Sequence, residues 1–285
     1  MTATPPTLRE RRATAEALAE LTSEPEGVAW AAVDLDCIRG LWADPIGGRI
    51  DRVLLYLHGG GYMVQSVNTH RRLGGHLAKA AGCRVFLVDY GLAPEHPHPG
   101  PVGDTTAAYR WMLENGFSPA QIAIAGDSSG GGLTLATLLK LRDDGTPLPA
   151  AGIAFSPWTD LEVLGDTVTT NADKDRFVTP EGLKGLAKNF LAGGDPRDPL
   201  ASPIHGDFSG VSPIYIQVGA NEILLDDSRR AAAAARSAGV DVTLDVFPDM
   251  QHVFQMRAGS LAEADDAIAR TGLWLRSRFG SSTSA

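Results

Sequence analysis

The sequence predicts an α/β protein, with a mostly parallel central sheet of about eight strands and helices on both faces. Short apolar and β-branched runs alternate with helical patterns along most of the 285 residues, and this alternation is typical of such a sheet. The chain is 44% hydrophobic and 21% charged, so it can bury a large core. We therefore expect a single domain that spans residues 1–285.

Eight runs have the character of strands, because β-branched and apolar residues dominate them. Only a few residues separate the first two runs, which favours an antiparallel hairpin at the start of the sheet. The eight runs cover residues 27–35, 38–44, 52–58, 84–90, 121–127, 150–157, 212–219 and 242–248.

Helical patterns lie between most of these strands. Several of them close on a glycine, which suits the left-handed conformation that commonly ends a helix. The helical patterns cover residues 69–82, 101–116, 131–145, 227–239 and 262–279.

Two segments interrupt the alternation of strands and helices. Residues 1–26 are polar and helical in pattern, and residues 160–211 mix loop with one helix near 180–191. A long insertion without a strand usually serves function. We expect both segments to form a helical cap over the open edge of the sheet.

Composition and charge exclude several kinds of partner. The formal net charge of -9 argues against nucleic acid, since proteins that bind phosphates usually carry a basic patch. No apolar run approaches the roughly 20 residues that span a bilayer, and the N-terminus has no signal core. We expect a soluble, cytoplasmic protein in which Cys37 and Cys83 are reduced structural thiols, because their spacing fits neither a metal site nor a paired motif.

The stretch around Ser128 predicts a nucleophile. Residues 126–130 read Gly-Asp-Ser-Ser-Gly, and a strand pattern gives way to a helix pattern within five residues. Such a strained turn holds a serine exposed between small residues that let the backbone approach. The alternative, a dinucleotide loop, fails because Leu135 stands where the third glycine should be.

A serine hydroxyl needs a base to remove its proton. Of the seven histidines, His252 follows the last predicted strand and precedes the C-terminal helix, which is the place of the base in hydrolases of Ser, acid, His order. Surface or packing roles suffice for four others, and the sixth lies in the predicted cap. These five are His70, His76, His96, His98 and His205, and the seventh, His58, precedes the three glycines at 59–61.

The acid that orients the base should follow the preceding strand. Glu222 comes three residues after Gly219, at the carboxyl edge of the sheet. Asp226 and Asp227 open the next helix, where carboxylates complement the helix dipole. We favour Glu222, with Asp226 as the alternative.

Three consecutive glycines follow the third predicted strand, at positions 59–61. Acyl transfer places negative charge on a carbonyl oxygen, and backbone N–H groups without a neighbouring Cβ can stabilise it. The residue after the nucleophile, Ser129, can supply a further N–H group. We therefore expect an oxyanion hole here.

Seven motifs in order resemble the hormone-sensitive-lipase-like family of α/β-hydrolase carboxylesterases. They extend from about residue 50 to residue 255. The motifs are HGGGY at 58, VDYGLAPEHPHP at 88, GDSSGG at 126, SPWTDL at 156, DPRDPLASP at 195, VGANEILLDD at 218 and PDMQHVF at 248.

The resemblance implies an α/β-hydrolase fold and assigns roles to residues. Ser128, His252 and Glu222 correspond to the nucleophile, general base and acid, although many relatives carry aspartate at the acid position. Gly60, Gly61 and Ser129 correspond to the oxyanion donors, although many relatives have alanine in place of Ser129, and Gly59 would mainly permit the turn. No metal and no organic cofactor is required.

The resemblance also implies short-chain acyl esters as substrates. Alternatives are a lactone hydrolase of the monoterpene-lactone type, an amidase and, more remotely, a non-catalytic ligand-binding module of the kind that lacks the histidine. Relatives often form homodimers through the last strand, here residues 242–247. We expect five apolar residues to be pocket walls: Tyr62, Trp158, Phe177, Phe190 and Ile223.

Overall fold

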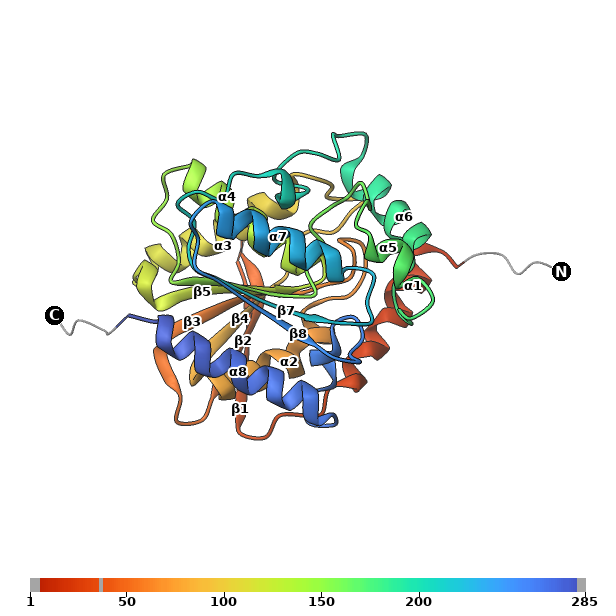
Figure 1. The fold of residues 1–285 in the computed structure, drawn as a ribbon. Coiled ribbons are helices and arrows are strands. Elements are labelled where there is room, and N and C mark those ends of the chain that lie inside the picture. The colour runs from red at the N-terminus through yellow and green to blue at the C-terminus, as the bar shows by residue number, and fades with distance from the viewer. Residues whose placement is uncertain (1–5, 36–37, 281–285) are drawn as a thin grey trace.

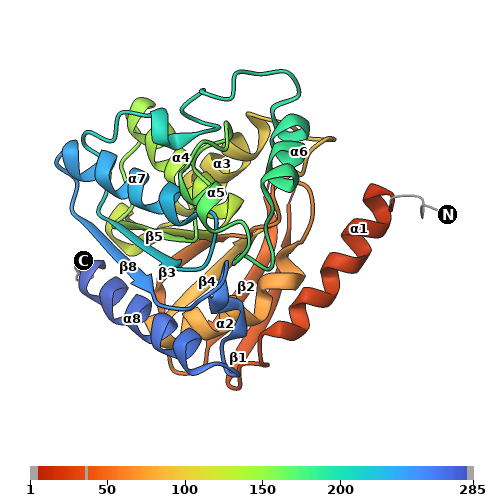
Figure 2. The same ribbon diagram turned by 45° about the vertical axis from the view of Figure 1, so that its right-hand side comes forward.

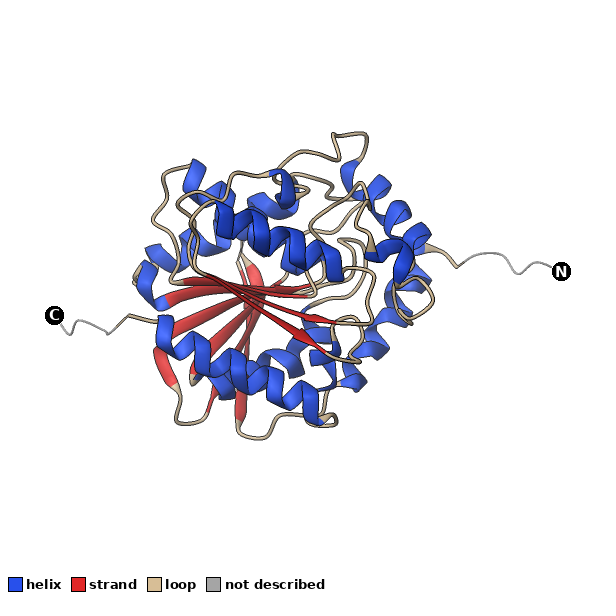
Figure 3. Ribbon diagram, in the orientation of Figure 1, coloured by secondary structure: helices blue, strands red, loops and turns tan. Residues whose placement is uncertain are grey.

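In the computed structural model, residues 6–35 and 38–280 are described, so Cys37 lies outside the described residues. Within them, eight strands form one sheet in the order β1-β2-β4-β3-β5-β6-β7-β8 (Figure 3). The strands are β1 (Val28–Asp34), β2 (Arg39–Pro45), β3 (Arg49–Leu57), β4 (Cys83–Val88), β5 (Ile122–Asp127), β6 (Ala151–Phe155), β7 (Ile214–Gly219) and β8 (Val242–Phe247).

The sheet is mostly parallel. β2 pairs antiparallel with β1 and with β4, while the other neighbouring strands pair parallel. The predicted hairpin of the first two strands is confirmed, and so is the predicted class of sheet. The carboxyl ends of β5 and β7 consequently reach the same edge, where Ser128 and Glu222 follow them.

Helices cover both faces of the sheet, as Figure 1 shows, with α3, α4 and α7 on one face and α2 and α8 on the other. The α-helices are α1 (Leu8–Ala15), α2 (Val67–Ala81), α3 (Gly100–Glu114), α4 (Ser129–Asp143), α5 (Thr167–Thr170), α6 (Pro180–Leu191), α7 (Leu225–Ser237) and α8 (Ala262–Arg278). The 3-10 helices are η1 (Glu16–Leu21), η2 (Pro119–Gln121), η3 (Pro203–His205) and η4 (Phe254–Arg257).

Helix α4 begins at Ser129, two residues before the predicted start. Its first turn contains Gly130, where a Cβ atom would lie only 2.0 Å from the carbonyl oxygen of Leu57. Glycine therefore lets the helix start directly against β3, although glycine is a poor helix former elsewhere. This close approach places the N-terminus of α4 beside the glycine loop.

Helix α1 has no fully buried residue; Leu8 packs against the core, and the side chain of Arg12 bonds the helix to the body. The Nε of Arg12 donates to the carbonyl oxygen of Met63 at 2.9 Å, and its Nη2 donates to Ala93 at 3.0 Å. Glu95 pairs with the same guanidinium at 2.7 Å. Figure 2 shows α1 beside the body on the side where α6 lies.

The outer strand β8 pairs with β7 alone. Val246 on this strand is 37% exposed. An unpaired strand edge can add to a second copy, so a homodimer through β8 stays a prediction.

None of the helices in the described ranges has the length and apolar character required to cross a bilayer. Cys83 at the start of β4 is buried, and burial raises the pKa of its thiol to about 12.

Candidate active site

Ser128 occupies the turn between β5 and α4, as the sequence predicts. Its φ of 51° and ψ of -120° are strained for a residue with a side chain. The neighbouring backbone holds this conformation, because its N–H donates to Phe155 at 2.8 Å and its carbonyl accepts the N–H of Trp158 at 2.9 Å. The turn thus has the geometry of a nucleophile elbow.

His252 joins Ser128 to Glu222. Its Nε2 lies 2.9 Å from Ser128 Oγ, and its Nδ1 lies 2.7 Å from Glu222 Oε2. These distances form a continuous hydrogen-bonded chain from hydroxyl to imidazole to carboxylate. The structure therefore brings together the three residues that the sequence analysis singled out.

The carboxylate of Glu222 is completely buried. Its Oε1 accepts the hydroxyl of Ser156 at 2.8 Å and the N–H of Gly219 at 2.5 Å, which leaves Oε2 for the imidazole. Asp226, the alternative acid, instead accepts the N–H of Asp166 at 3.0 Å. Both carboxylate oxygens of Glu222 are thus held by hydrogen bonds, so the longer glutamate side chain still reaches His252.

Ser156 is a positioning residue that the sequence analysis missed. Its hydroxyl donates to Glu222 and also accepts the N–H of Val253, the residue after the imidazole, at 3.2 Å. It is fully buried and has a φ of 46°. The motif SPWTDL contains it, but nothing in that motif indicates which loop it contacts.

The electrostatic surroundings act on the imidazole in two directions. Burial lowers the pKa of His252, whereas the hydrogen bond and negative charge of Glu222 raise it. The net effect places the pKa above its ordinary value of 6.5. A neutral imidazole in this position can accept a proton from the serine hydroxyl, and the carboxylate of Glu222 can stabilise an imidazolium.

The glycine loop lies directly before Tyr62. Gly60 and Gly61 have φ angles of 106° and 62°, which residues with a Cβ rarely adopt. Among the described residues, no hydrogen-bond acceptor takes the N–H groups of Gly60, Gly61 or Ser129. These three donors are available to a developing oxyanion.

Gly59 has another role than the predicted turn. It is not among the glycines with positive φ. A Cβ atom there would lie 2.3 Å from Asp127 Oδ2, and the Gly59 N–H donates to Asp127 Oδ1 at 3.1 Å. Glycine at this position is therefore required by the carboxylate packed against the loop.

Asp127 precedes the nucleophile and is 2% exposed. Its carboxylate also accepts the hydroxyl of Tyr56 at 2.8 Å and lies 3.2 Å from His70 Nε2. Burial raises the pKa of Asp127, but His70 and these hydrogen bonds lower it further, so the net shift is downward. The sequence predicts a surface or packing role for His70, and the structure buries this residue in the wall of the active-site cavity.

His58 opens the glycine motif and packs against Tyr90, with ring centroids 4.5 Å apart. Burial, and then the charge of His70, lower the pKa of His58 to about 4. The imidazole is therefore neutral, and Tyr90 donates its hydroxyl to the His58 carbonyl at 2.6 Å. His58 thus packs beneath the glycine loop and supports it.

A cavity of about 970 Å³ opens over Ser128 and His252. Its walls come from the catalytic loops and from both segments that interrupt the alternation of strands and helices. Lining residues include Leu18 and Leu21 from η1, Phe177 and Val178 before α6, Leu183 and Leu186 on α6, and Gly60, Gly61 and Trp158 at the base.

Two of the five predicted pocket walls, Trp158 and Phe177, line this cavity. The prediction is wrong for the other three. Tyr62 and Phe190 stack on each other with centroids 3.7 Å apart and are at most 1% exposed, and Ile223 is fully buried. Apolar side chains next to the catalytic loops complete the core behind the cavity.

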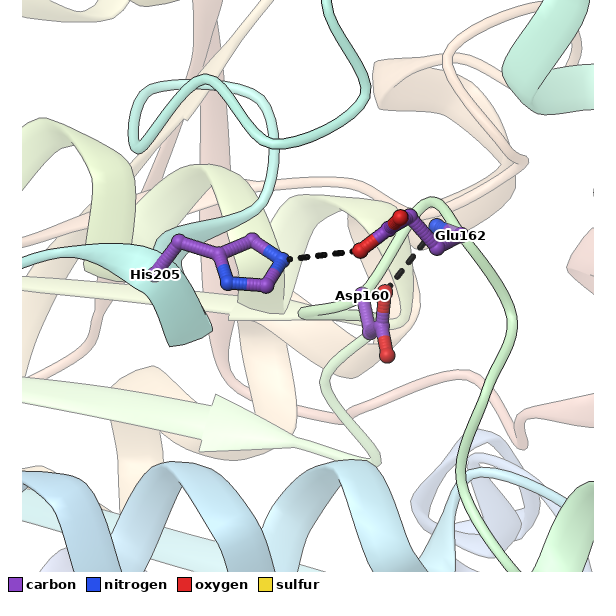
Figure 4. Close-up of side chains that lie close together, drawn as sticks. All are labelled: Asp160, Glu162 and His205. Atoms are coloured by element: carbon purple, nitrogen blue, oxygen red, sulfur yellow. Dashed lines mark hydrogen bonds and ion pairs between the residues drawn. The ribbon is translucent and has the colours of Figure 1, made fainter.

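Another titratable cluster contains Asp160, Glu162 and His205 (Figure 4). None of the three lines the cavity. His205 Nε2 lies 3.4 Å from Glu162 Oε2, and Arg230 pairs with Asp160 Oδ2 at 2.7 Å. Because Arg230 already neutralises the buried Asp160, we assign no cation to this cluster.

Comparison with known proteins agrees with this fold. A sequence model described as alpha/beta hydrolase fold matches residues 54–256. An acetyl-hydrolase of Streptomyces hygroscopicus is 46% identical over 229 residues, which cover 80% of this chain and 77% of that protein. The acetyl-hydrolase LipR of Mycobacterium tuberculosis, named as putative, is 35% identical over 91% of this chain and 85% of its own.

Comparison with solved structures also identifies the fold. An esterase from the bacterial hormone-sensitive lipase family superposes with a TM-score of 0.94 and 46% identity, over 98% of this chain and 94% of its own. Fold and site thus define an α/β-hydrolase. Within that class, the chain belongs to the hormone-sensitive-lipase-like family of carboxylesterases.

Proposed function

We propose that this protein is a serine carboxylesterase that hydrolyses short-chain acyl esters through an acyl-enzyme intermediate. The observation that carries the proposal is the hydrogen-bonded chain from Ser128 through His252 to Glu222 at the base of a cavity. A relative named acetyl-hydrolase supports a short acyl group, and a relative named esterase supports ester hydrolysis.

In the first step, His252 Nε2 takes the proton of Ser128 as its oxygen attacks the ester carbonyl. The N–H groups of Gly60, Gly61 and Ser129 receive the negative charge on the carbonyl oxygen. The imidazolium, held by Glu222, then protonates the leaving alcohol. In the second step, His252 takes a proton from water as the water oxygen attacks the acyl-enzyme carbonyl. The carboxylic acid is released, and Ser128 regains its proton from the imidazolium.

We also propose that the chain works as one domain in which residues 1–26 and 160–211 form the cap, of which residues 1–5 lie outside the described residues. Cavity walls from η1 and α6 support this role. The cap would select the acyl group by its apolar walls, while the catalytic loops perform the chemistry. No step requires a metal or an organic cofactor.

The decisive experiment replaces Ser128 with Ala and measures turnover of p-nitrophenyl butyrate. We expect a loss of about 10³-fold or more in kcat, because removal of a nucleophile leaves only the oxyanion hole and binding. The control is Ser209→Ala, which removes a serine hydroxyl outside the cavity lining. Full activity in Ser128→Ala, with an unchanged circular dichroism spectrum, would refute the proposed nucleophile.

A second measurement tests the covalent intermediate. A fluorophosphonate should add one phosphonyl group to the wild type and none to Ser128→Ala, as read by intact-protein mass spectrometry. Matched ester, lactone and amide substrates then separate the carboxylesterase from the lactone hydrolase and amidase alternatives. The base His252 contacts Ser128 directly, which counts against a non-catalytic binding module.

A further inference from the structure

Three arginines from separate segments line the catalytic cavity: Arg11 on α1, Arg176 between α5 and α6, and Arg257 at the end of η4. All three are exposed. Within the described residues, none of their guanidinium groups pairs with a carboxylate, whereas Arg84 and Arg230 do so elsewhere. Three unpaired cations therefore face one cavity of a protein whose formal net charge is -9.

Each arginine belongs to a segment anchored to the catalytic loops. The N–H of Arg176 donates to the Oε1 of Gln251, the neighbour of His252, at 2.9 Å. The Nε2 of Gln251 holds the same segment through the carbonyl of Lys174 at 3.1 Å. The backbone of Arg176 is thus tied to the residue next to His252.

The other two arginines are placed in a similar way. Arg257 ends the short helix that follows the imidazole loop. Arg11 is the neighbour of Arg12, whose guanidinium holds the carbonyl of Met63, two residues beyond Gly61. All three arginines therefore line the cavity that contains Ser128 and His252.

The carboxylates of the lining do not cancel this charge. Glu20 pairs with Arg72 at 3.1 Å, and Asp127 lies 3.2 Å from His70. Asp249 is the remaining lining carboxylate, and it has no cationic partner in the described part of the chain. Among the described residues, the cavity lining thus carries three unpaired guanidinium groups and one unpaired carboxylate.

We propose that the cavity binds esters carrying a second, ionised carboxylate, such as monoesters of dicarboxylic acids. Arginine recognises a carboxylate through paired N–H donors, and a cavity lined by one sign of charge concentrates ligands of the other. The apolar walls, among them Leu183 and Leu186, accommodate the chain that joins the ester to the carboxylate. The inference rests on the proposed function and specifies its substrate class.

The test compares monoethyl esters of succinic, adipic and suberic acids with the matched ω-amides, which are neutral and nearly the same shape. Hydrolysis is followed in a pH-stat at pH 7.5 and low ionic strength. We expect kcat/KM for the acid to exceed that for its amide by about tenfold at the best chain length, mainly through KM, since exposed ion pairs are individually weak and several act together. The preference should decline with added NaCl as the charges are screened.

Variants identify the groups responsible. Arg11→Gln, Arg176→Gln and Arg257→Gln should each reduce the ratio of acid to amide, and the triple variant should bring it close to one. Arg229→Gln removes an exposed arginine outside the cavity lining and should leave the ratio unchanged. Because the ratio is taken within one variant, a general loss of folding or activity does not alter it.

Equal kcat/KM for acid and amide at every chain length would overturn the inference, as would a preference that persists in the triple variant. The two proposals fail differently. If p-nitrophenyl butyrate and the amide esters are hydrolysed but the acids are not preferred, the substrate class alone is wrong. If none of these esters is hydrolysed, the esterase function itself is wrong.

Discussion

The backbone N–H of Gly59 donates to the carboxylate of Asp127 at 3.1 Å, and this bond ties the glycine loop to the residue that precedes the nucleophile. On the other side of Ser128, the Oγ of Ser129 accepts the N–H of Tyr62 at 3.3 Å. Side chains flanking the nucleophile thus hold both ends of the loop 59–62. The proposed oxyanion donors and the Oγ of Ser128 are therefore positioned by the same short stretch of chain, residues 127–129.

Asp127→Asn should lower kcat for p-nitrophenyl butyrate by roughly tenfold or more, with little change in KM. The substitution removes the charge that faces His70 and weakens the bond to Gly59; hydrogen bonds to charged groups contribute about 1.5–3 kcal/mol. Steady-state kinetics separates the effect on kcat from the effect on KM. Asp173→Asn, an exposed change of equal charge, is the control, and an equal fall of kcat in both variants would contradict the positioning role.

Glu222→Gln should reduce kcat by about 10³-fold, because the imidazole loses the partner that orients it and stabilises its charge. Asp226→Asn should stay within about fivefold of the wild type, since an exposed hydrogen bond contributes only about 1 kcal/mol. The measurement is kcat on the same short ester. A larger loss in the second variant would reverse the assignment of the acid.

The pH dependence of kcat/KM should report the ionisation of the His252 imidazole. Because Glu222 holds the pKa of His252 above 6.5, the base is protonated and inactive at low pH, and kcat/KM should rise with pH through that raised pKa. In Glu222→Gln the residual activity should rise at a lower pH, since burial alone lowers the pKa. An unshifted acidic limb in the variant would assign that limb to another group.

Asp227 gives a prediction about stability. Burial raises the pKa of this fully buried carboxyl to about 7, and its Oδ2 accepts the N–H groups of Thr159 and Asp160 at 2.8 and 3.0 Å. An acid with a raised pKa binds more protons folded than unfolded, so its contribution is present below the unfolded pKa of about 3.9 and is lost as pH rises through about 7.

Asp227→Asn should therefore raise Tm relative to the wild type increasingly between pH 5 and pH 8. The asparagine oxygen can still accept both N–H groups, and no charge must be buried. Differential scanning calorimetry at several pH values tests this. Parallel curves for the two proteins would show that Asp227 does not titrate in this range.

The sequence by itself determined the class of sheet, and it singled out Ser128 and His252 as candidate catalytic residues. The reason is local: alternating strand and helix patterns set the topology, and a strand, a strained turn and a helix lie within one continuous stretch around Ser128. The position of His252 follows from chain order, and Glu222 from its place after a strand. These features need no knowledge of what lies across the fold.

Only the tertiary structure decided which distant residues support that site. Gly59 and Asp127 are 68 positions apart, Ser156 and Glu222 are 66 apart, and Arg12 meets Met63 across 51. Tyr62, Phe190 and Ile223 turned inward rather than toward the cavity, while three arginines of separate segments converged on it. Hydrophobic burial and ion pairing depend on three-dimensional neighbours, which a one-dimensional pattern of residue types does not specify.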